Sequence, residues 1–461
     1  MKTTKEIQEE RIQHLNDADI RDGDYVLYWM QSSQRAEYNH ALEYAVQQAN
    51  DLGQRLLVVF GLTDDYPEAN LRHYAFMLEG LKDAEDALRK RGIKLAVRKG
   101  SPDDVALEAG KDASLIVTDR GYMRPQKDWR EKVSRKAGRR LTQVESDMVV
   151  PVELASEKKE YAARTLRPRI QKHLDEFLVE LKPTKLDKQS LNMKADGIDL
   201  SDIEKVLGGM KLDKSVGSLS HLYRGGNSEA KKMFRRFLKN SFGGYDGNRN
   251  QPQTDNVSHM SKYLHFGHVS PIYLALEAKD ASAGREDIDS FMEELIVRRE
   301  LTMNFVHYTP NYDSYSCLPD WAKKTLEEHK KDEREHSYTR KQLEDAETHD
   351  SYWNAAMKEM VHTGYMHNYM RMYWGKKILE WSNTPEHAYK TTLYLNNKYF
   401  LDGRDPNSFA NVSWVFGQHD RGWTERAVYG KVRYMSAGGL ERKSKPEKYV
   451  EKVEARIPNQ R

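Results

Sequence analysis

The most distinctive side chains of this sequence lie between residues 353 and 381, a stretch with a helical pattern that contains three of the eight tryptophans. Within it Asn368, Arg371 and Met372 are spaced i, i+3 and i+4, so one face of a helix presents an amide, a cation and a thioether. Such a face could line a site for a flat aromatic cofactor. It could also be core, which is the commoner reason for methionine and aromatic residues at helical spacing.

Two further segments carry residue types with ligand chemistry. Glu294 lies in an apolar stretch, where desolvation favours the neutral carboxyl form, which can donate a hydrogen bond to a ligand carbonyl group. It could instead be a surface glutamate that pairs with Arg298 four residues later. Ser258 and Ser261 precede a helical run whose first N–H groups would attract a phosphate. The alternative for these serines is simple N-capping of that helix.

Basic residues are mixed with aromatic ones in two segments. Residues 421–450 hold eight Lys or Arg against three acids, with a tryptophan and two tyrosines between Arg421 and Tyr434. Residues 231–249 hold six basic residues against Asp246 alone. Cations for phosphates and rings for unstacked bases suit a nucleic-acid surface, although a solvated face is the commoner explanation of any one basic run.

The sequence shows neither a membrane-spanning segment nor the cysteines for an internal disulfide bond. The chain of 461 residues is long enough for two or three domains. Of these residues 38% are hydrophobic and 31% are charged, which indicates a globular protein with a very polar surface. No apolar run approaches the ~18–20 residues that cross a bilayer, and the N-terminus lacks the apolar core of a signal peptide. The single cysteine, Cys317, excludes an internal disulfide and a Cys-rich metal site. We therefore expect a cytoplasmic protein, associated with the nucleoid or nuclear in a eukaryote, that uses no metal.

The first third of the sequence alternates strands and helices. Short apolar runs predict strands at residues 25–30, 55–60, 93–98, 114–118 and 141–150, with helices at residues 37–52, 71–90, 102–109 and 126–136. Strands separated by helices form a parallel sheet that is covered on both faces. No Gly-x-Gly-x-x-Gly follows the first strand, so an ordinary dinucleotide site is not indicated.

The remainder of the sequence predicts helices. Strand patterns end near Glu157, and residues 182–220 are polar and interrupted by proline and glycine, as in an interdomain connection. The fold class we expect is α/β plus all-α. Its parts are an N-terminal arm (1–22), a Rossmann-like parallel-sheet domain (23–155), a polar interdomain connection (156–220) and a C-terminal helical domain (221–461).

Several segments together resemble the photolyase and cryptochrome superfamily. GYMHNYMRM at 364–372 with the tryptophan that follows resembles its flavin-site helix, and DNVSHMSKYLHFGHVSP at 255–271 resembles its flavin-phosphate loop. EELIVRRE at 293–300 resembles its active-site helix, and LDGRDPNSFANVSW at 401–414 resembles the segment under the flavin ring. DYVLYWMQSSQRAEYNHAL at 24–42 is similar to the start of class II cyclobutane pyrimidine dimer photolyases in particular.

This resemblance implies light-driven repair of cyclobutane pyrimidine dimers in double-stranded DNA by a monomer. In that family reduced FAD, as FADH⁻, passes an electron to a dimer that has been extruded from the duplex. The α/β domain would hold an antenna chromophore, for which we expect a deazaflavin (8-hydroxy-5-deazaflavin) in preference to a folate. The alternative is a cryptochrome-type blue-light sensor with the same flavin and no repair activity. A (6-4) photolyase would show histidines at the substrate face, whereas His362 and His367 look structural.

The resemblance also implies roles for individual residues. Those expected to hold FAD are Tyr245, Val257, Ser258, His259, Met260, Ser261, Arg298, Asn368, Arg371, Asn396, Asp402, Gly403 and Arg404. Those expected to act catalytically at the dimer are Glu294, Asn368, Met372, Asn396 and Trp414. Those expected to contact DNA are Arg249, Asn250, Trp414, Arg421, Trp423, Lys431 and Arg433. An electron chain would run from Trp374 through Trp353 to Trp381, which would lie nearest the solvent.

The sequence departs from other photolyase classes beside the substrate and in the electron chain. Where those classes have a tryptophan three residues after the active-site glutamate, this chain has Val297, so we expect Trp414 and Met372 to pack the dimer. Where they have a tryptophan two residues before the one that matches Trp414, this chain has Val412. The second difference agrees with tryptophans that have moved to another helix, as class II proteins have them.

The segment under the flavin ring also differs. Arg371 and Asp402 correspond to the family's ion pair, in which a cation near the ring favours the anionic reduced flavin. Six residues after that aspartate, other classes have an asparagine that faces flavin N5, and this chain has Ser408. Class II proteins use an asparagine from the preceding segment, which resembles Asn396, with Asn397 as the alternative.

Overall fold

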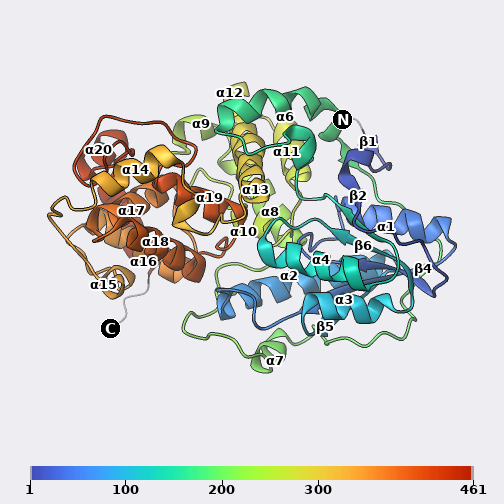
Figure 1. The fold of residues 1–461 in the computed structure, drawn as a ribbon. Helices are drawn as coiled ribbons and strands as arrows, with labels where there is room; N and C mark the ends of the chain where they lie inside the picture. The colour runs from blue at the N-terminus through green and yellow to red at the C-terminus, as the bar shows by residue number, and fades with distance from the viewer. Residues whose placement is uncertain (1–2, 458–461) are drawn as a thin grey trace. The chain divides into compact units, whose positions relative to one another are not determined.

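The computed structural model describes residues 3–457 (Figure 1). They form two compact units. The first, which we call the sheet unit, consists of the chain up to Glu157 with Arg167–Arg236 and His259–Ala281; the second, the helical unit, consists of Lys158–Leu166, Phe237–Ser258 and the chain from Ser282 onward. This grouping follows packing, so the division into functional parts at residues 22, 155 and 220 stays a prediction. The outermost residues of the arm and of the helical domain, 1–2 and 458–461, lie outside the described range.

The sheet unit is built on six strands in the order β2-β7-β6-β3-β4-β5. Neighbouring strands are parallel except β2, an edge strand that runs antiparallel to β7. The strands are β1 Thr3–Thr4, β2 Ile12–His14, β3 Tyr25–Trp29, β4 Arg55–Leu62, β5 Lys94–Lys99, β6 Ala113–Asp119, β7 Leu141–Val144 and β8 Glu180–Leu181, of which β1 and β8 form a separate parallel pair. The predicted parallel sheet is confirmed; β2 was not predicted, because it has a single apolar residue.

Helices cover both faces of this sheet, as the apolar pattern predicts. The helices up to residue 279 are α1 His40–Asp51, α2 Leu71–Lys90, α3 Pro102–Gly110, α4 Arg124–Lys136, α5 Val152–Ala155, α6 Ala163–Phe177, α7 Ile203–Gly208, α8 Asn227–Asn240, α9 Tyr245–Asn248, α10 Ser261–His265 and α11 Pro271–Lys279. Alternate strand residues such as Val26 and Val58 pack with α1 and α2, while Leu27 and Val59 pack with α3 and α4. The result is a doubly wound layer of helix, sheet and helix.

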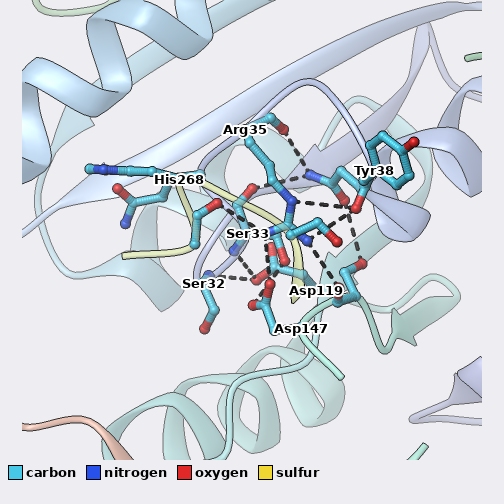
Figure 2. A network of polar contacts seen from close by, with 12 residues as sticks. Ser32, Ser33, Arg35, Tyr38, Asp119, Asp147 and His268 are labelled. Atoms are coloured by element: carbon cyan, nitrogen blue, oxygen red, sulfur yellow. Dashed lines mark hydrogen bonds and ion pairs between the residues drawn. The ribbon is translucent and has the colours of Figure 1, made fainter. Parts of the chain in front are cut away.

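The strand predicted at residues 141–150 ends at Val144, because the chain then turns into a buried polar network (Figure 2). In this network Asp147 forms an ion pair with Arg35 at 2.7 Å, and the Arg35 side chain is fully buried. The same guanidinium donates to the carbonyl oxygen of Ser146 at 2.9 Å. The buried guanidinium of Arg35 needs these hydrogen-bond partners. The strand prediction was wrong after Val144 because Ser146 and Asp147, which bind this guanidinium, cannot also continue the hydrogen bonding of the sheet.

The network also organises the carboxyl ends of β3 and β6, the two strands at which the order of the sheet reverses (Figure 2). Asp119 accepts the backbone N–H groups of Gln31 at 2.8 Å and Ser33 at 3.0 Å, and the hydroxyl of Tyr28 at 3.0 Å. Burial, with the nearby charge of Asp147, raises the pKa of the Asp119 carboxyl. The loop that follows β3 is therefore held in one shape by a single carboxyl group. Ligands of open parallel sheets bind at such a reversal.

The helical unit contains the motifs at residues 293–300, 364–372 and 401–414. Its helices after residue 282 are α12 Arg285–Met292, α13 Arg299–Tyr308, α14 Asp320–Glu328, α15 Arg340–Glu344, α16 Ser351–Thr363, α17 Asn368–Trp381, α18 Pro385–Tyr399, α19 Pro406–Val415, α20 Ala437–Lys443 and α21 Pro446–Arg456, with a π-helical segment, η2 Glu293–Arg298, between α12 and α13 and a 3₁₀ turn, η3 Tyr315–Cys317, before α14. Helix α17 packs against α16, α18 and α19 (Figure 1). In the described part of the chain, no helix is long and apolar enough to cross a membrane.

The helical pattern at residues 353–381 is two helices and not one. Helix α16 ends before Gly364, which adopts the left-handed conformation at φ 65°. Helix α17 begins after His367, whose side chain accepts the N–H of Tyr369 at 3.2 Å and so caps the new helix. Asn368, Arg371 and Met372 still share one helix, so the break leaves the proposed site residues together.

Candidate functional site

Arg371 and Asp402 form a two-pronged ion pair between α17 and the turn that follows α18. Nη1 and Nη2 of Arg371 donate to the two carboxylate oxygens of Asp402, each at 3.1 Å. Nε donates to the carbonyl oxygen of Met366 at 3.0 Å, and the guanidinium lies 3.9 Å from the centre of the Phe400 ring. The side chains are 25% and 10% exposed, so the pair is largely shielded from water. It fixes the position of one cation between a carboxylate, a backbone carbonyl and an aromatic ring.

The turn after α18 has room for glycine alone at position 403. A Cβ atom on Gly403 would lie 2.9 Å from the carbonyl oxygens of both Asn396 and Phe400. Distances below 3.0 Å to backbone atoms force the backbone to move. Gly403 therefore acts by letting the turn close, and this brings Asp402 to Arg371.

Two neighbouring asparagines at the end of α18 have different surroundings. The side-chain oxygen of Asn397 accepts the N–H of Arg404 at 3.0 Å and the amide of Asn396 at 3.0 Å, and Asn397 is fully buried. Arg404 has a positive φ of 64°, so Asn397 supports a conformation that non-glycine residues rarely adopt. Ser408 donates to the carbonyl oxygen of Asp402 at 2.9 Å and braces the same turn.

The three tryptophans expected to form an electron chain lie together in the helical unit. The indole N–H of Trp353 donates to the backbone carbonyl of Trp374 at 3.0 Å. The rings of Trp353 and Trp381 are 5.6 Å apart and inclined at 66°. All three side chains are buried. An electron can pass directly between closely packed indole rings inside a protein, so this geometry suits electron transfer along the three tryptophans.

Trp381 is buried, and its place as the tryptophan of the chain that lies nearest the solvent stays a prediction. It is 2% exposed. The rings of Tyr338 and His349 each lie 5.3 Å from it and cover it, and the Tyr338 hydroxyl is 2.7 Å from Nδ1 of His349. The reason is that the residues on either side of α15 lie against the last residue of α17, which the helical pattern alone does not reveal.

Glu294 is part of a compact group with Arg249 and Tyr245. Nη1 of Arg249 lies 2.7 Å from a carboxylate oxygen of Glu294, and the side chains are 26% and 33% exposed. Burial and the charge of Glu294 raise the pKa of Tyr245 to about 12, and the same residue has a side-chain hydrogen bond with Arg249. The Tyr245 ring packs against that of Phe291 at 5.6 Å. The structure thus joins a residue expected on DNA to one expected at the dimer.

The alternative pairing of Glu294 with Arg298 is wrong. The segment that carries both is π-helical, so residues five apart, and not four, come into line. Nε of Arg298 accordingly donates to Glu293 at 3.0 Å. The Arg298 side chain is 54% exposed, and its expected contact with the flavin stays a prediction. Single π-turns inside helices are frequent at functional sites.

Trp414, in the last turn of α19, lies beside a series of alternating cations and rings. The guanidinium carbon of Arg433 is 5.6 Å from the centre of Trp414 and 4.1 Å from that of Trp423, and Arg421 lies 5.2 Å from Trp423. Asp420 accepts hydrogen bonds from Arg433 at 2.8 and 3.2 Å. This series fixes the segment at residues 420–433, which we call the basic loop. Trp423, at the outer end of the series, is 38% exposed.

The other expected residues are placed as follows. Asn250, Asn368, Arg421 and Lys431 are exposed, and Met372 is half-buried. Of the expected phosphate loop, Val257 and Ser258 belong to the helical unit, whereas His259, Met260 and Ser261 belong to the sheet unit. Helix α10 begins at Ser261 with Met260 as its N-cap, so capping of this helix by a serine is wrong.

Sequence reasoning missed three residues at the site. Lys376 lies over the Trp414 ring, Asp420 holds Arg433, and Phe400 stacks on Arg371. Lys376 could have been found, because it continues the spacing of Asn368 and Met372 by one more turn.

The residues present suit a bound flavin. The indole N–H of Trp374 is buried and has no hydrogen-bond partner within the described residues, which is expected where a bound group supplies the acceptor. The Arg371 guanidinium offers a fixed cation and Asn396 offers an amide, the two functions that an anionic isoalloxazine ring requires. Among residues 3–457 no group of His, Cys, Asp and Glu is arranged to hold a metal ion.

Comparison with known proteins identifies the family. The family model described as DNA photolyase matches residues 26–187. The deoxyribodipyrimidine photo-lyase of Methanothermobacter thermautotrophicus is 51% identical over 97% of this chain and 98% of its own length. The chain belongs to the deoxyribodipyrimidine photo-lyase family. The photo-lyase of Arabidopsis thaliana is 38% identical over 94% of this chain and 89% of its own.

Two solved photolyase structures share the fold of the chain. A class III photolyase from Agrobacterium tumefaciens has a TM-score of 0.73 at 18% identity, over 95% of this chain and 87% of that one. An archaeal photolyase from Sulfolobus tokodaii, solved with two FAD molecules, has a TM-score of 0.68 at 19% identity, over 93% and 89%. At these identities the likeness establishes the fold alone, and it agrees with the sheet and the helical region expected from the sequence.

Proposed function

We propose that this protein is a light-driven DNA repair enzyme that splits cyclobutane pyrimidine dimers and uses reduced FAD. The observation that carries the proposal is the 51% identity, over nearly the whole of both chains, to a protein named deoxyribodipyrimidine photo-lyase. The Arg371–Asp402 pair supports it, because the pair holds a largely shielded cation in a fixed position, and such a cation would stabilise an anionic ring beside it.

FAD would be held by the turn after α18 and by α17. Arg371 would place its charge near the ring and favour the anionic reduced form, and Asp402 would keep that cation in place. When bound, the reduced flavin supplies the electron that splits the cyclobutane ring and accepts it again. Gly403 and Arg404 would approach the cofactor through their backbone. Tyr245, Val257 and Ser258 of the helical unit would contact its dinucleotide part, as the resemblance implies, and the contacts expected of His259, Met260 and Ser261 stay a prediction.

Asn396 is our choice for the residue that faces flavin N5. Asn397 is fully buried, and its carboxamide oxygen already accepts two hydrogen bonds from its own turn. Asn396 donates one amide hydrogen to Asn397, which orients its side chain and leaves its oxygen for another partner. An asparagine placed in this way could hold the N5 proton of a reduced flavin.

The dimer would lie among Glu294, Met372, Asn368 and Trp414. Extrusion of a base costs a few kcal/mol, and the cost is smallest for a damaged and poorly stacked pair. The exposed cations Arg421 and Lys431 would neutralise DNA phosphates, the half-buried Arg433 would lie beside them in its pair with Asp420, and Trp423 would stack on bases. Since Glu294 pairs with Arg249 in the free protein, we expect DNA phosphates to compete for Arg249 and to release the carboxyl group toward the dimer.

The tryptophans would reduce the resting flavin. An electron would pass from Trp381 through Trp353 to Trp374, in an order that agrees with the Trp353 and Trp381 ring contact and the Trp353 to Trp374 hydrogen bond. The feature that distinguishes this relay from other classes, Val412 in place of a tryptophan, is one that the class II resemblance implies.

The sheet unit would hold the antenna chromophore, for which we retain a deazaflavin in preference to a folate. The carboxyl ends of β3 and β6, where the strand order reverses, are the place at which sheets of this type bind ligands, and Asp119 fixes the loop there. We also propose that the protein acts as a monomer on double-stranded DNA, in the cytoplasm or nucleus.

One experiment separates this proposal from a cryptochrome-type sensor. The purified protein is examined for a flavin spectrum, reduced, and mixed with an oligonucleotide that contains one thymine dimer, in the dark and under blue light. Repair that requires illumination is the expected result. A flavin spectrum without repair would favour the sensor, and protein that cannot be loaded with FAD would reject both.

A further inference from the structure

Lys376 is a fully buried lysine in contact with Trp414. Its side chain is 0% exposed, and Nζ lies 5.0 Å from the centre of the Trp414 ring. Nζ donates a hydrogen bond to the carbonyl oxygen of Val415, the residue after Trp414 and the last of α19. A cation at a helix C-terminus interacts favourably with the helix dipole and satisfies a carbonyl that has no partner within the helix.

The close approach of α17 and α19 makes this contact possible. A Cβ atom on Gly375 would lie 2.7 Å from Cγ2 of Val415, so a larger residue there would force the Val415 side chain or one of the helices to shift. Lys376 lies one turn after Met372 and two turns after Asn368, on the α17 face that we assign to the dimer. The glycine thus places the lysine under the end of α19, next to the proposed substrate residues.

The same lysine is connected to the basic loop. The hydroxyl of Tyr429 donates to the backbone carbonyl of Lys376 at 2.9 Å. Arg433 from that loop is the second cation at the Trp414 ring, at 5.6 Å, and Asp420 neutralises it. Trp414 is therefore held from two elements, by Lys376 of α17 and by Arg433 of the loop.

We propose that Lys376 is a positioning residue for the repair site, whose ammonium group fixes the last turn of α19 and the Trp414 indole where they meet the extruded pyrimidine pair. This inference rests on the proposed function, because it takes Trp414 as the ring that packs the dimer. The physical reason is that a cation away from water attracts an aromatic face more strongly than an exposed one does. An indole that is held before binding loses less freedom when the dimer stacks on it.

The inference has a pH-dependent consequence. Burial lowers the pKa of Lys376 to about 7, with Asp420 acting to raise it and Arg433 to lower it. The ammonium form, and with it the attraction for Trp414, is present below about pH 7 and is lost above it. Preference for damaged over undamaged DNA should therefore decrease as the pH rises from 6 to 8.5, by up to about thirtyfold if the contact behaves as a desolvated cation–aromatic pair.

The test is dark binding of the flavin-loaded enzyme to matched oligonucleotides with and without a thymine dimer, measured by fluorescence anisotropy across this pH range. Lys376→Met removes the charge at similar volume, and Lys376→Arg keeps a charge that does not titrate here. Lys377→Met is the control, because it removes one positive charge from the neighbouring residue, whose ammonium group pairs with Glu380.

The wild type and Lys377→Met should lose discrimination as the pH rises. Lys376→Met should discriminate weakly at every pH, and Lys376→Arg should keep the low-pH preference throughout. Equal, parallel pH profiles for wild type, Lys376→Met and Lys376→Arg would overturn the inference. If Lys376→Met does not fold, the comparison of wild type with Lys376→Arg decides, and parallel profiles again overturn it. A wild type that shows no preference for dimer DNA at any pH, and no repair in light, would reject the proposed function itself.

Discussion

Replacement of Asp402 by asparagine tests the ion pair at the centre of the proposed flavin site. Asparagine has nearly the same shape, so Asp402→Asn keeps one hydrogen-bond acceptor and removes the charge. Arg371 then keeps its hydrogen bond to Met366 and its contact with Phe400, but its charge has no counterion in the pair. We expect both a loss of stability and a loss of FAD.

The magnitude follows from burial. Removal of one partner from a fully buried pair costs about 3–5 kcal/mol. Because a quarter of the Arg371 side chain remains exposed, water compensates in part, and we expect about 2–3 kcal/mol. For a cooperative unit of this size the thermal midpoint should decrease by about 5–10 °C.

The assay is thermal unfolding by circular dichroism of protein with and without bound FAD, together with flavin absorbance after gel filtration. Asp289→Asn is the matched control, because Asp289 pairs with Arg285 at 3.4 Å while the side chains are 66% and 91% exposed. An exposed pair contributes at most ~1 kcal/mol, so the control should unfold close to the wild type. If Asp402→Asn unfolds with the control and retains its flavin, the pair does not have the role assigned to it.

Two further variants test the electron chain and the substrate side. Trp374→Phe should block light-driven reduction of the oxidised flavin and leave repair by chemically reduced enzyme unchanged, as followed by flavin absorbance and by dimer assay; normal photoreduction would remove Trp374 from the relay. Glu294→Gln should retain FAD and slow ring splitting by at least about tenfold, the effect of losing one group that stabilises developing charge. A repair yield per absorbed photon equal to that of the wild type would exclude Glu294 from the site.

Much of the fold follows from local patterns. Helix α2 has the predicted bounds, and the strand that begins at Arg55 contains five consecutive apolar residues, Leu56 to Phe60, which leaves little choice of conformation. The edge strand β2 lacks such a run. It forms because the open edge of β7 offers unpaired backbone groups, and this cannot be read from residues 12–14.

The site is less predictable, because its contacts join distant parts of the chain. Arg249 and Glu294 pair across 45 residues, and neither has a local feature that indicates the other. The π-helical segment has one extra residue in its turn, so Arg298 pairs with Glu293, five residues earlier. The i+4 spacing of an α-helix does not predict this pairing. The pairing of Arg371 with Asp402 was expected from the resemblance alone, since 31 residues separate them.

The lifetime of the excited reduced flavin tests the central claim most directly. The loaded, pre-reduced enzyme is excited with blue light, and its flavin fluorescence decay is recorded alone, with undamaged oligonucleotide and with dimer oligonucleotide. If the residues around Arg371 and Trp414 hold the flavin and an extruded dimer within electron-transfer distance, only the dimer oligonucleotide should shorten the fluorescence lifetime. Repaired pyrimidines should then appear in proportion to this shortening. A lifetime that is the same with all three samples would contradict the account.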